Sequence, residues 1–158
     1  MDRINCLLED EEFQIFLKKN SELEVNRIFC HHDITHLLDV CRIAMIINYE
    51  RELKIEKELI YAAGLLHDIG RWVEYENGRD HAEVSAELAL PLLKRCKFTN
   101  SEIEEITLAI RSHRKKEHES DLSAILYEAD KSSRLCFNCD AKDKCKRFLN
   151  GELYYLKY

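Results

Sequence analysis

The chain has 158 residues, of which 46% are hydrophobic and 34% charged, so it is long enough to bury a sizeable core in a single domain. Its formal net charge of −6 argues against general nucleic-acid binding by charge alone. No stretch approaches the roughly 20 apolar residues of a membrane span, and the first residues lack a signal-peptide pattern. We therefore expect a cytoplasmic protein with no membrane partner. The seven cysteines are then expected to be free thiols or metal ligands rather than disulfides.

Only four glycines and one proline interrupt the chain, which favours an all-α fold. The spacing of apolar residues predicts a short amphipathic helix over about 10–19 and a second helix over about 34–52. Asp33 is a plausible N-cap of the second helix, and capping explains the pair His32-Asp33 without further chemistry. His36 falls on the apolar stripe of that helix. Taken alone, it is most simply a core histidine with satisfied hydrogen bonds.

A third helix is predicted over about 56–69, in the most apolar part of the sequence. This helix should lie at the centre of the domain, yet it ends in the ionisable pair His67 and Asp68. Burying these side chains is costly unless something pairs with them, and a bound metal ion is one good partner. We expect Gly70 to close the helix as its C′ residue. The polar residues 71–80, which include an Asn-Gly turn signal, should follow as a turn.

A fourth helix is predicted from the N-cap Asp80 to about residue 96, with His81 at its start and a kink or shortening at Pro91. Residues 99–101 begin a fifth helix with two alternative capping boxes.

The apolar stripe of the fifth helix continues to His113. A sixth helix, over about 121–134, places Asp130 on its apolar stripe, where an aspartate is rarely found without a partner.

The C-terminal tail contains three further cysteines, Cys136, Cys139 and Cys145. Two cysteines at this C-x-x-C spacing can chelate one metal ion, and Cys145 is a candidate third ligand. A structural zinc or iron–sulfur site is one interpretation, although no fourth ligand is evident. Reduced thiols that pack around a short terminal helix are the alternative.

Four histidines and two aspartates therefore lie on predicted core faces near helix ends. Imidazoles and carboxylates are standard ligands of first-row transition metals, and six ligands exceed the needs of one tetrahedral zinc ion. The set suits two ions that share a bridging carboxylate. The residues are His36, His67, Asp68, His81, His113 and Asp130.

The order of these residues resembles the HD-domain superfamily of metal-dependent phosphohydrolases. The family pattern is a histidine, a later His-Asp doublet and a final aspartate, which match His36, His67-Asp68 and Asp130. The resemblance covers roughly residues 30–135 and implies a single HD-type domain over 1–158. It also implies a compact bundle of about six to seven helices, with a cysteine-containing extension over about 136–158.

Two additional histidines, His81 and His113, are similar to the extra ligands of dinuclear HD enzymes such as the bacterial hydrolases of diadenosine tetraphosphate. Those hydrolases commonly have a second histidine after the one matched by His113, whereas this chain has Arg114. The Gly-Tyr-Pro signature of cyclic-di-GMP phosphodiesterases is replaced here by residues 71–73, Arg-Trp-Val, which argues against that activity.

The resemblance implies a phosphohydrolase or phosphodiesterase that acts on a nucleotide or another small phosphate ester through a metal-activated hydroxide. Asp68 is the expected catalytic residue because it would bridge the ions. Lys131 and Arg71 are expected to bind substrate phosphate, and the basic residues 114–116 are further candidates.

Several alternatives remain open at this point. A di-iron oxygenase similar to inositol oxygenase uses the same ligand order, and a metal-containing nucleotide sensor would bind without turnover. One or two divalent ions are expected, and iron, manganese, cobalt, nickel and zinc all suit nitrogen and oxygen ligands. The sequence does not identify the substrate or the oligomeric state.

Overall fold

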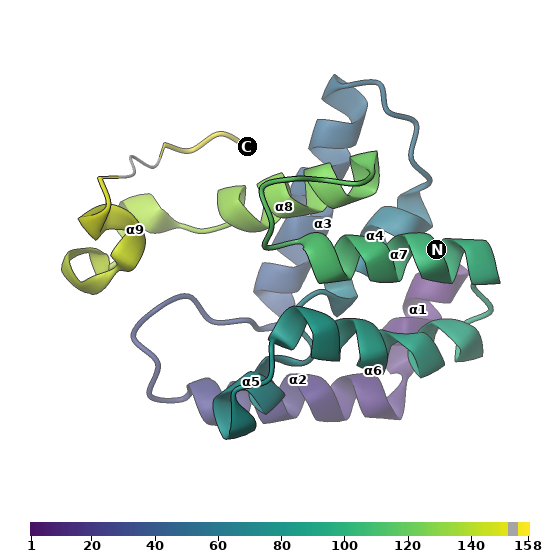
Figure 1. Cartoon of the computed structure of the whole chain (residues 1–158), viewed down its shortest axis with the longest axis horizontal. Helices are drawn as coiled ribbons and strands as arrows, with labels where there is room; N and C mark the ends of the chain where they lie inside the picture. Colours follow the sequence, from purple (N-terminus) through teal and green to yellow (C-terminus); the bar gives the residue numbers. More distant parts are fainter. Residues whose placement is uncertain (152–154) are drawn as a thin grey trace.

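The structure of the chain is a computed structural model that describes residues 1–151 and 155–158, shown as a ribbon in Figure 1. Its regular segments in those ranges are all helical, which confirms the all-α prediction. Two short 3-10 turns, Cys136–Asn138 and Lys142–Lys144, lie near the C-terminus. The α-helices are α1 (Asp2–Glu9), α2 (Glu11–Glu24), α3 (Ile34–Glu50), α4 (Lys57–Leu66), α5 (Arg71–Asn77), α6 (His81–Arg95), α7 (Asn100–Ser112), α8 (Asp121–Ser132) and α9 (Lys146–Leu149).

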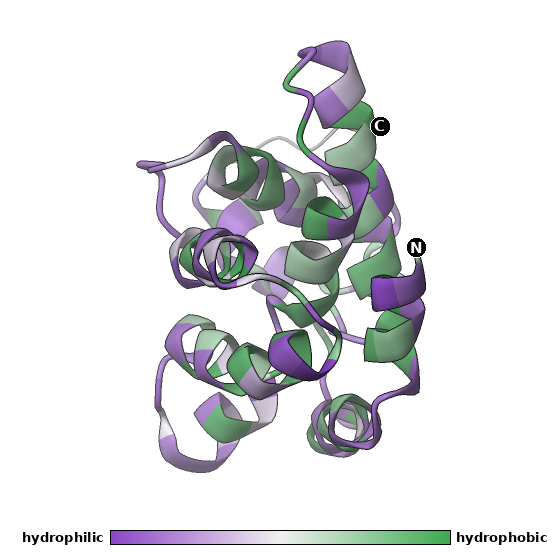
Figure 2. Cartoon of the chain, turned by 90° about the vertical axis from the view of Figure 1, so that its right-hand side faces the viewer, coloured by the Kyte–Doolittle hydropathy of each residue, from purple (hydrophilic) through white to green (hydrophobic). Residues whose placement is uncertain are grey.

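The apolar helix α4 occupies the middle of the bundle and contacts α1, α3, α6, α7 and α8. Every residue from Leu59 to Leu66 except Tyr61 is buried. Burial of a leucine side chain contributes about 1.5–3 kcal/mol, so this run is a major source of stability. The hydropathy colours of Figure 2 follow the same division, because many polar stretches lie on the outside of the helices.

Gly64 allows α4 to approach α3 closely. A Cβ atom added at Gly64 would lie 2.5 Å from the sulfur of Cys41 and 3.3 Å from its Cα. Real Cβ atoms essentially never approach other heavy atoms within 3.0 Å. The glycine therefore sets how near the two central helices pack, and α3 and α4 in turn position His36 and His67.

The predicted helix starts are confirmed at several N-caps. The side chain of Asp33 accepts a hydrogen bond from the backbone N–H of His36, and Asp80 accepts one from Ala82. Of the two possible capping boxes before α7, the structure forms the one between Thr99 and Glu102. Each cap satisfies backbone groups that a helix end leaves unpaired.

The prediction for Gly70 is wrong. Helix α4 ends at Leu66, and Gly70 instead precedes a further helix, α5, in the segment predicted to be a turn. Gly70 has an ordinary negative φ of −94°. Its Cβ position lies 2.7 Å from the backbone nitrogen of Ser85, so the glycine is needed for close contact with α6.

Two other local predictions also differ from the structure. Helix α1 was not expected, and it adds the buried side chains of Ile4 and Leu7 to the core. Pro91 does not shorten α6, which continues to Arg95.

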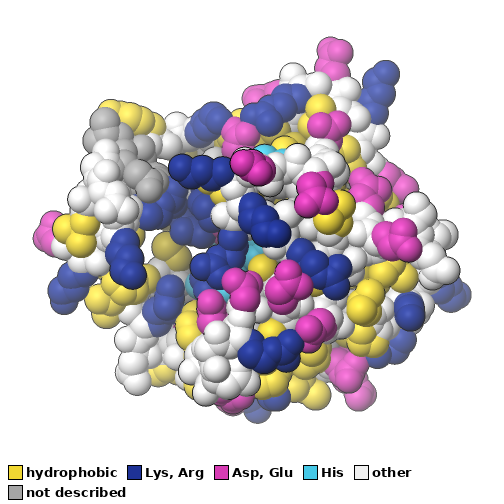
Figure 3. Space-filling model, in the orientation of Figure 1, with side chains coloured by type: hydrophobic (Ala, Val, Ile, Leu, Met, Phe, Trp, Pro, Cys, Tyr) yellow, Lys and Arg dark blue, Asp and Glu magenta, His cyan; other side chains and the backbone are white. Residues whose placement is uncertain are grey.

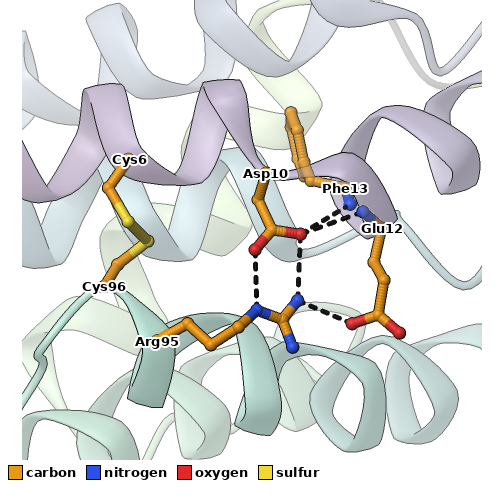
Figure 4. Close-up of a disulfide and its surroundings, with 6 residues drawn as sticks. All are labelled: Cys6, Asp10, Glu12, Phe13, Arg95 and Cys96. Carbon is orange, nitrogen blue, oxygen red and sulfur yellow. Dashed lines mark hydrogen bonds and ion pairs between the residues drawn. A yellow bond between two sulfur atoms is a disulfide. The ribbon is translucent and has the colours of Figure 1, made fainter.

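A disulfide joins Cys6 in α1 to Cys96 at the end of α6, with a Cα–Cα distance of 5.7 Å (Figure 4). The expectation that the cysteines avoid disulfides is therefore wrong for this pair. Sequence spacing could not reveal it, because 90 residues separate the two cysteines and α1 was not predicted. The other cysteines of the described chain are free thiols. Beside the disulfide, Arg95 of α6 forms ion pairs with Asp10 and Glu12 at the start of α2 (Figure 4).

None of the helices in the ranges 1–151 and 155–158 combines the length and the apolar character that a membrane span requires.

Candidate metal centre

The ends of five helices meet at one buried point of the bundle. His36 lies in the first turn of α3, and His67 and Asp68 directly follow α4. His81 is the first residue of α6, His113 directly follows α7, and Asp130 lies in the last turn of α8. The fold thus brings together all six predicted metal ligands: His36, His67, Asp68, His81, His113 and Asp130.

Asp68 stands at the centre of this group, and its two oxygens face different histidines. Oδ2 lies 3.2 Å from Nε2 of His67 and 3.9 Å from Nε2 of His36. Oδ1 lies 3.1 Å from Nε2 of His81 and 3.6 Å from Nε2 of His113. The carboxylate therefore separates the four imidazoles into two pairs.

Hydrogen bonds on the far side of each ring orient these histidines. Nδ1 of His67 lies 2.7 Å from the carbonyl oxygen of Gly64, and Nδ1 of His113 lies 2.6 Å from that of Ile110. A carbonyl only accepts, so Nδ1 must carry a proton, and a neutral ring then has its lone pair on Nε2. Nε2 of each ring faces the centre, where it can coordinate a metal ion once it carries no proton.

Side chains orient the other two rings. Nδ1 of His81 lies 2.6 Å from Oε2 of Glu74, and Nδ1 of His36 lies 3.3 Å from the hydroxyl oxygen of Ser133. A carboxylate behind a ligating histidine fixes its orientation and raises its basicity.

Several buried polar atoms at the centre have no hydrogen-bond partner among the residues that the structure describes. They are Nε2 of His36, Nε2 of His67 and Oδ1 of Asp68. Leaving such atoms unsatisfied costs about 1–3 kcal/mol each, and more for a charged group. A cation held between them would satisfy nitrogen and oxygen lone pairs together, so these residues fit a bound metal ion.

The donor atoms form two groups, and within each group they lie within 4.8 Å of one another. One group consists of His36, His67, Asp68 and Asp130, and the other of Asp68, His81 and His113. Nitrogen and carboxylate donors suit divalent transition metals without selecting one of them. The cluster can therefore hold a divalent metal ion, and Asp68 belongs to both groups.

Burial and charge determine the protonation of several of these candidate ligands. Burial opposes ionisation of Asp68, but the charges of His67, His32 and Arg71 outweigh it and hold its pKa well below the usual value. Burial lowers the pKa of His36 to about 4, with a contribution from His67. It also lowers the pKa of His113 to about 3. Asp68 is thus a carboxylate, and His36 and His113 are neutral, near pH 7.

A small polar cavity of about 210 Å³ opens above this centre. Its walls contain Asp68, His81, His113 and Asp130, together with four cationic side chains. Figure 3 shows dark-blue lysine and arginine side chains gathered around histidine atoms near the middle of the view. The four cations are Arg71, Arg114, Lys131 and Arg134.

Two of these cations hold Asp130. Nζ of Lys131 lies 2.6 Å from Oδ2 of Asp130, and Nη2 of Arg134 lies 2.8 Å from the same oxygen. Burial opposes ionisation of Asp130, yet the charges of Arg134 and Lys131 hold its pKa well below the usual value. Lys131 was predicted to lie here. Arg134 was not predicted to lie here. It follows Asp130 by one helical turn, and this spacing in the sequence could have indicated the ion pair.

A second network that the sequence did not predict approaches Asp68 from the other side. Nη2 of Arg71 donates to Nε2 of His32 at 2.8 Å, and Nδ1 of His32 contacts Oε1 of Glu24 at 2.5 Å. Nε2 of His32 is also 3.7 Å from Oδ2 of Asp68. The capping role of Asp33 is confirmed, but His32 is a buried neighbour of the metal centre and not merely part of a cap.

Glu24 anchors this network from the last turn of α2. Its carboxylate also accepts hydrogen bonds from the backbone N–H of His32 at 2.7 Å and from the Tyr75 hydroxyl at 2.6 Å. Burial raises the pKa of Glu24, but the hydrogen bond and charge of His32 prevail and lower it to about 2. Glu24, His32 and Arg71 thus form a connected chain that leads to Asp68.

The three tail cysteines, Cys136, Cys139 and Cys145, are not part of the histidine–aspartate centre. They line a separate cleft beside it, together with residues of the loop between α2 and α3.

Comparisons with known proteins place this geometry in a family. The model of the HD domain matches residues 33–135. An uncharacterised protein of Clostridium beijerinckii is 42% identical over 98% of this chain and 100% of its own length. The crystal structure of a predicted HD superfamily hydrolase from an uncultured Thermotogales bacterium superposes with a TM-score of 0.60 and 34% identity, covering 75% of this chain and 66% of that one.

Ribonuclease Y of Mycoplasma capricolum is 30% identical over 74% of this chain. The chain spans only about a fifth of that relative's length, since the match covers 21% of it. The matched region of the family model contains all six candidate ligands. The chain therefore belongs to the HD domain family, and both its metal-binding cluster and its resemblance to an HD superfamily hydrolase support a hydrolase role.

Proposed function

We propose that the protein is a dinuclear metal-dependent phosphohydrolase that acts on a small phosphate ester, with a nucleotide as the favoured substrate class. One observation carries the proposal: two donor groups share Asp68 at the floor of a cavity that four cations line. His36, His67 and Asp130 would complete one ion site, and His81 and His113 the other. Bound divalent ions supply Lewis acidity toward a phosphoryl oxygen and lower the pKa of water at the site.

The protein side chains contribute the positioning. Asp68 would hold both ions at a fixed separation, while hydrogen bonds behind the imidazoles keep Nε2 aimed inward. Arg71, Lys131 and Arg134 line the cavity and are suited to bind phosphate oxygens, because arginine can donate two parallel hydrogen bonds to them. Cations fixed there stabilise charge that grows on the phosphoryl group in the transition state.

The cavity size restricts what enters. About 210 Å³ accommodates a phosphate group and part of its ester, so a larger substrate would leave its remainder outside. The ribonuclease Y relatives make a short RNA a second candidate substrate, and the net charge of −6 argues against broad binding of long nucleic acids.

Replacing Asp68 with alanine tests the proposal. We expect loss of bound metal and about a thousandfold loss of phosphate release or phosphodiester cleavage, because the several kcal/mol that the ions supply disappear together. The assay measures metal content and turnover on mononucleotides, dinucleoside polyphosphates, cyclic dinucleotides and a short RNA. Asp39→Ala is the matched control, since Asp39 is a half-buried residue of α3 outside both donor groups, and its carboxylate pairs with Arg42.

Unchanged metal content and turnover in the Asp68 variant would contradict the proposal. Stoichiometric metal with nucleotide binding but no turnover would indicate the sensor instead. Oxygen uptake by an iron-loaded protein would favour the oxygenase.

A further inference from the structure

The C-terminal extension and the loop between α2 and α3 together form a second potential metal site. In Figure 1 both segments lie on the same side of the bundle, away from α1 and α7. They enclose a cleft of about 280 Å³. Four cysteines line it: Cys30 from the loop, and Cys136, Cys139 and Cys145 from the extension.

Cys30 is a candidate for the fourth ligand, which the sequence pattern of the three tail cysteines does not identify. It precedes Cys136 by more than a hundred residues, so spacing alone gives no reason to associate them. All four thiols are free, Cys136 is buried, and the other three are half-buried. Four cysteine thiols are the usual ligand set of a structural zinc ion or an iron–sulfur cluster.

The charges around the cleft suit an anionic metal–thiolate unit. Four thiolates with one zinc ion, or with a four-iron cluster, leave a net negative charge. No acidic residue lines the cleft in the described part of the chain, whereas six basic residues do. They are Arg27, Arg71, Arg134, Lys144, Lys146 and Arg147.

The distances between the sulfur atoms distinguish a tetrahedral zinc site from an iron–sulfur cluster. With Zn–S bonds of about 2.3 Å, tetrahedral geometry requires all sulfurs to be about 3.8 Å apart. Among the described residues, only the histidine–aspartate groups place three candidate donor atoms within 4.8 Å of one another, and no trio of these cysteines does so. A cubane cluster holds its cysteine sulfurs farther apart, because each binds a different iron corner.

We propose that Cys30, Cys136, Cys139 and Cys145 bind a [4Fe–4S] cluster next to the catalytic centre. The cluster would fasten the extension to the loop that leads into His32. It is independent of the proposed hydrolysis, because none of the four cysteines belongs to the histidine–aspartate groups.

The test is iron and acid-labile sulfide analysis of the full chain, purified without oxygen and then incubated with equal amounts of ferrous and ferric iron and with sulfide. We expect about four sulfides per chain and the broad visible absorption of a cluster. Cys30→Ser and Cys139→Ser should each remove most of the sulfide and the absorption. Cys41→Ala is the matched control, because Cys41 is a free thiol buried in α3, outside the cleft.

Sulfide distinguishes the cluster from iron in the histidine–aspartate centre, so it should persist in Asp68→Ala. Circular dichroism establishes that each serine variant is folded. Stoichiometric zinc that depends on the four cysteines, with no sulfide, would overturn the cluster. Absence of both zinc and sulfide, or sulfide unaffected by Cys30→Ser in a folded protein, would overturn the site.

Discussion

Glu74 offers a way to weaken one of the two proposed ion sites without replacing any of its candidate ligands. Its carboxylate lies 2.6 Å from Nδ1 of His81, and it also accepts from Nη1 of Arg71 at 2.9 Å. Replacing Glu74 with glutamine keeps the shape and one oxygen but removes the negative charge behind the imidazole. His81 then becomes a weaker ligand, whereas His36 and His67 rely on Ser133 and Gly64.

The size of the effect follows from the geometry. Loss of a partner that orients a ligating histidine costs about 10- to 100-fold in metal affinity, which corresponds to about 1.4–2.7 kcal/mol. The high end is expected here, because a contact of 2.6 Å to a carboxylate is short and charge-assisted. Burial raises the pKa of Glu74, but the charge of His81 and hydrogen bonds from His81 and Arg71 lower it. The group that glutamine replaces is therefore a full charge at neutral pH.

Calorimetric titration of the metal-free protein with Mn²⁺ measures the two sites in one experiment. In Glu74→Gln, the weaker binding step should shift by 10- to 100-fold, while the step assigned to His36, His67 and Asp130 should change little. Glu87→Gln makes the same charge change on α6, where Glu87 is exposed and pairs with Arg79. Equal weakening of both steps, or a single ion per chain in the unaltered protein, would refute the assignment of His81 to a separate site.

Two further predictions concern stability. Replacing Cys6 and Cys96 with serine opens a loop of 90 residues, which should cost about 4–5 kcal/mol and lower the Tm by roughly 10–18 °C in a thermal scan. Metal content should not change, since helix geometry places Cys96 about 22 Å along α6 from His81, and its loss would contradict this separation. For the metal-free protein, His36 and His113 have pKa values of about 4 and about 3, below the 6.5 of an unfolded histidine. Between these values and pH 6.5, the unfolded chain therefore binds more protons than the folded chain. The free energy of unfolding, measured in urea, should reach its highest value above about pH 6.5 and decrease as the pH falls toward 3. A free energy that does not change with pH would show that burial does not keep these rings neutral.

The helical fold could be predicted because its main signals are local. Short sequence segments are sufficient to identify the apolar stretch of α4 and the helix caps at Asp33, Asp80 and Thr99. Helices α1 and α5 escaped prediction because each is short and charged, and each is stabilised by packing against the rest of the bundle. The prediction that Gly70 ends the helix was wrong for the same reason. Gly70 allows close contact with the backbone of Ser85 in α6, and this contact exists only in the folded chain.

The clustering of the candidate ligands was predictable because an ionisable residue on an apolar stripe is visible in the sequence. His36, His113 and Asp130 each continue such a stripe, and the structure brings them together. No comparable sequence pattern identifies the residues that hold the candidate ligands in place. Glu74 reaches His81 across the α5–α6 turn, and His32 reaches Arg71 over 39 residues, so only the folded chain reveals these contacts.

The charges around the centre argue for an anionic substrate. Near neutral pH, the acids of the network around the centre are carboxylates whose charges are opposed by four cations, and His36 and His113 are neutral. Two divalent ions would add four positive charges to this pocket. In a partly buried site such an excess is costly, because charges interact several-fold more strongly there than in bulk water. An anionic phosphate ester offsets this excess, whereas a neutral substrate such as a polyol would not. This favours phosphoryl chemistry over oxygenation of a sugar-like molecule. The acids are Glu24, Asp68, Glu74 and Asp130, and the cations are Arg71, Arg114, Lys131 and Arg134.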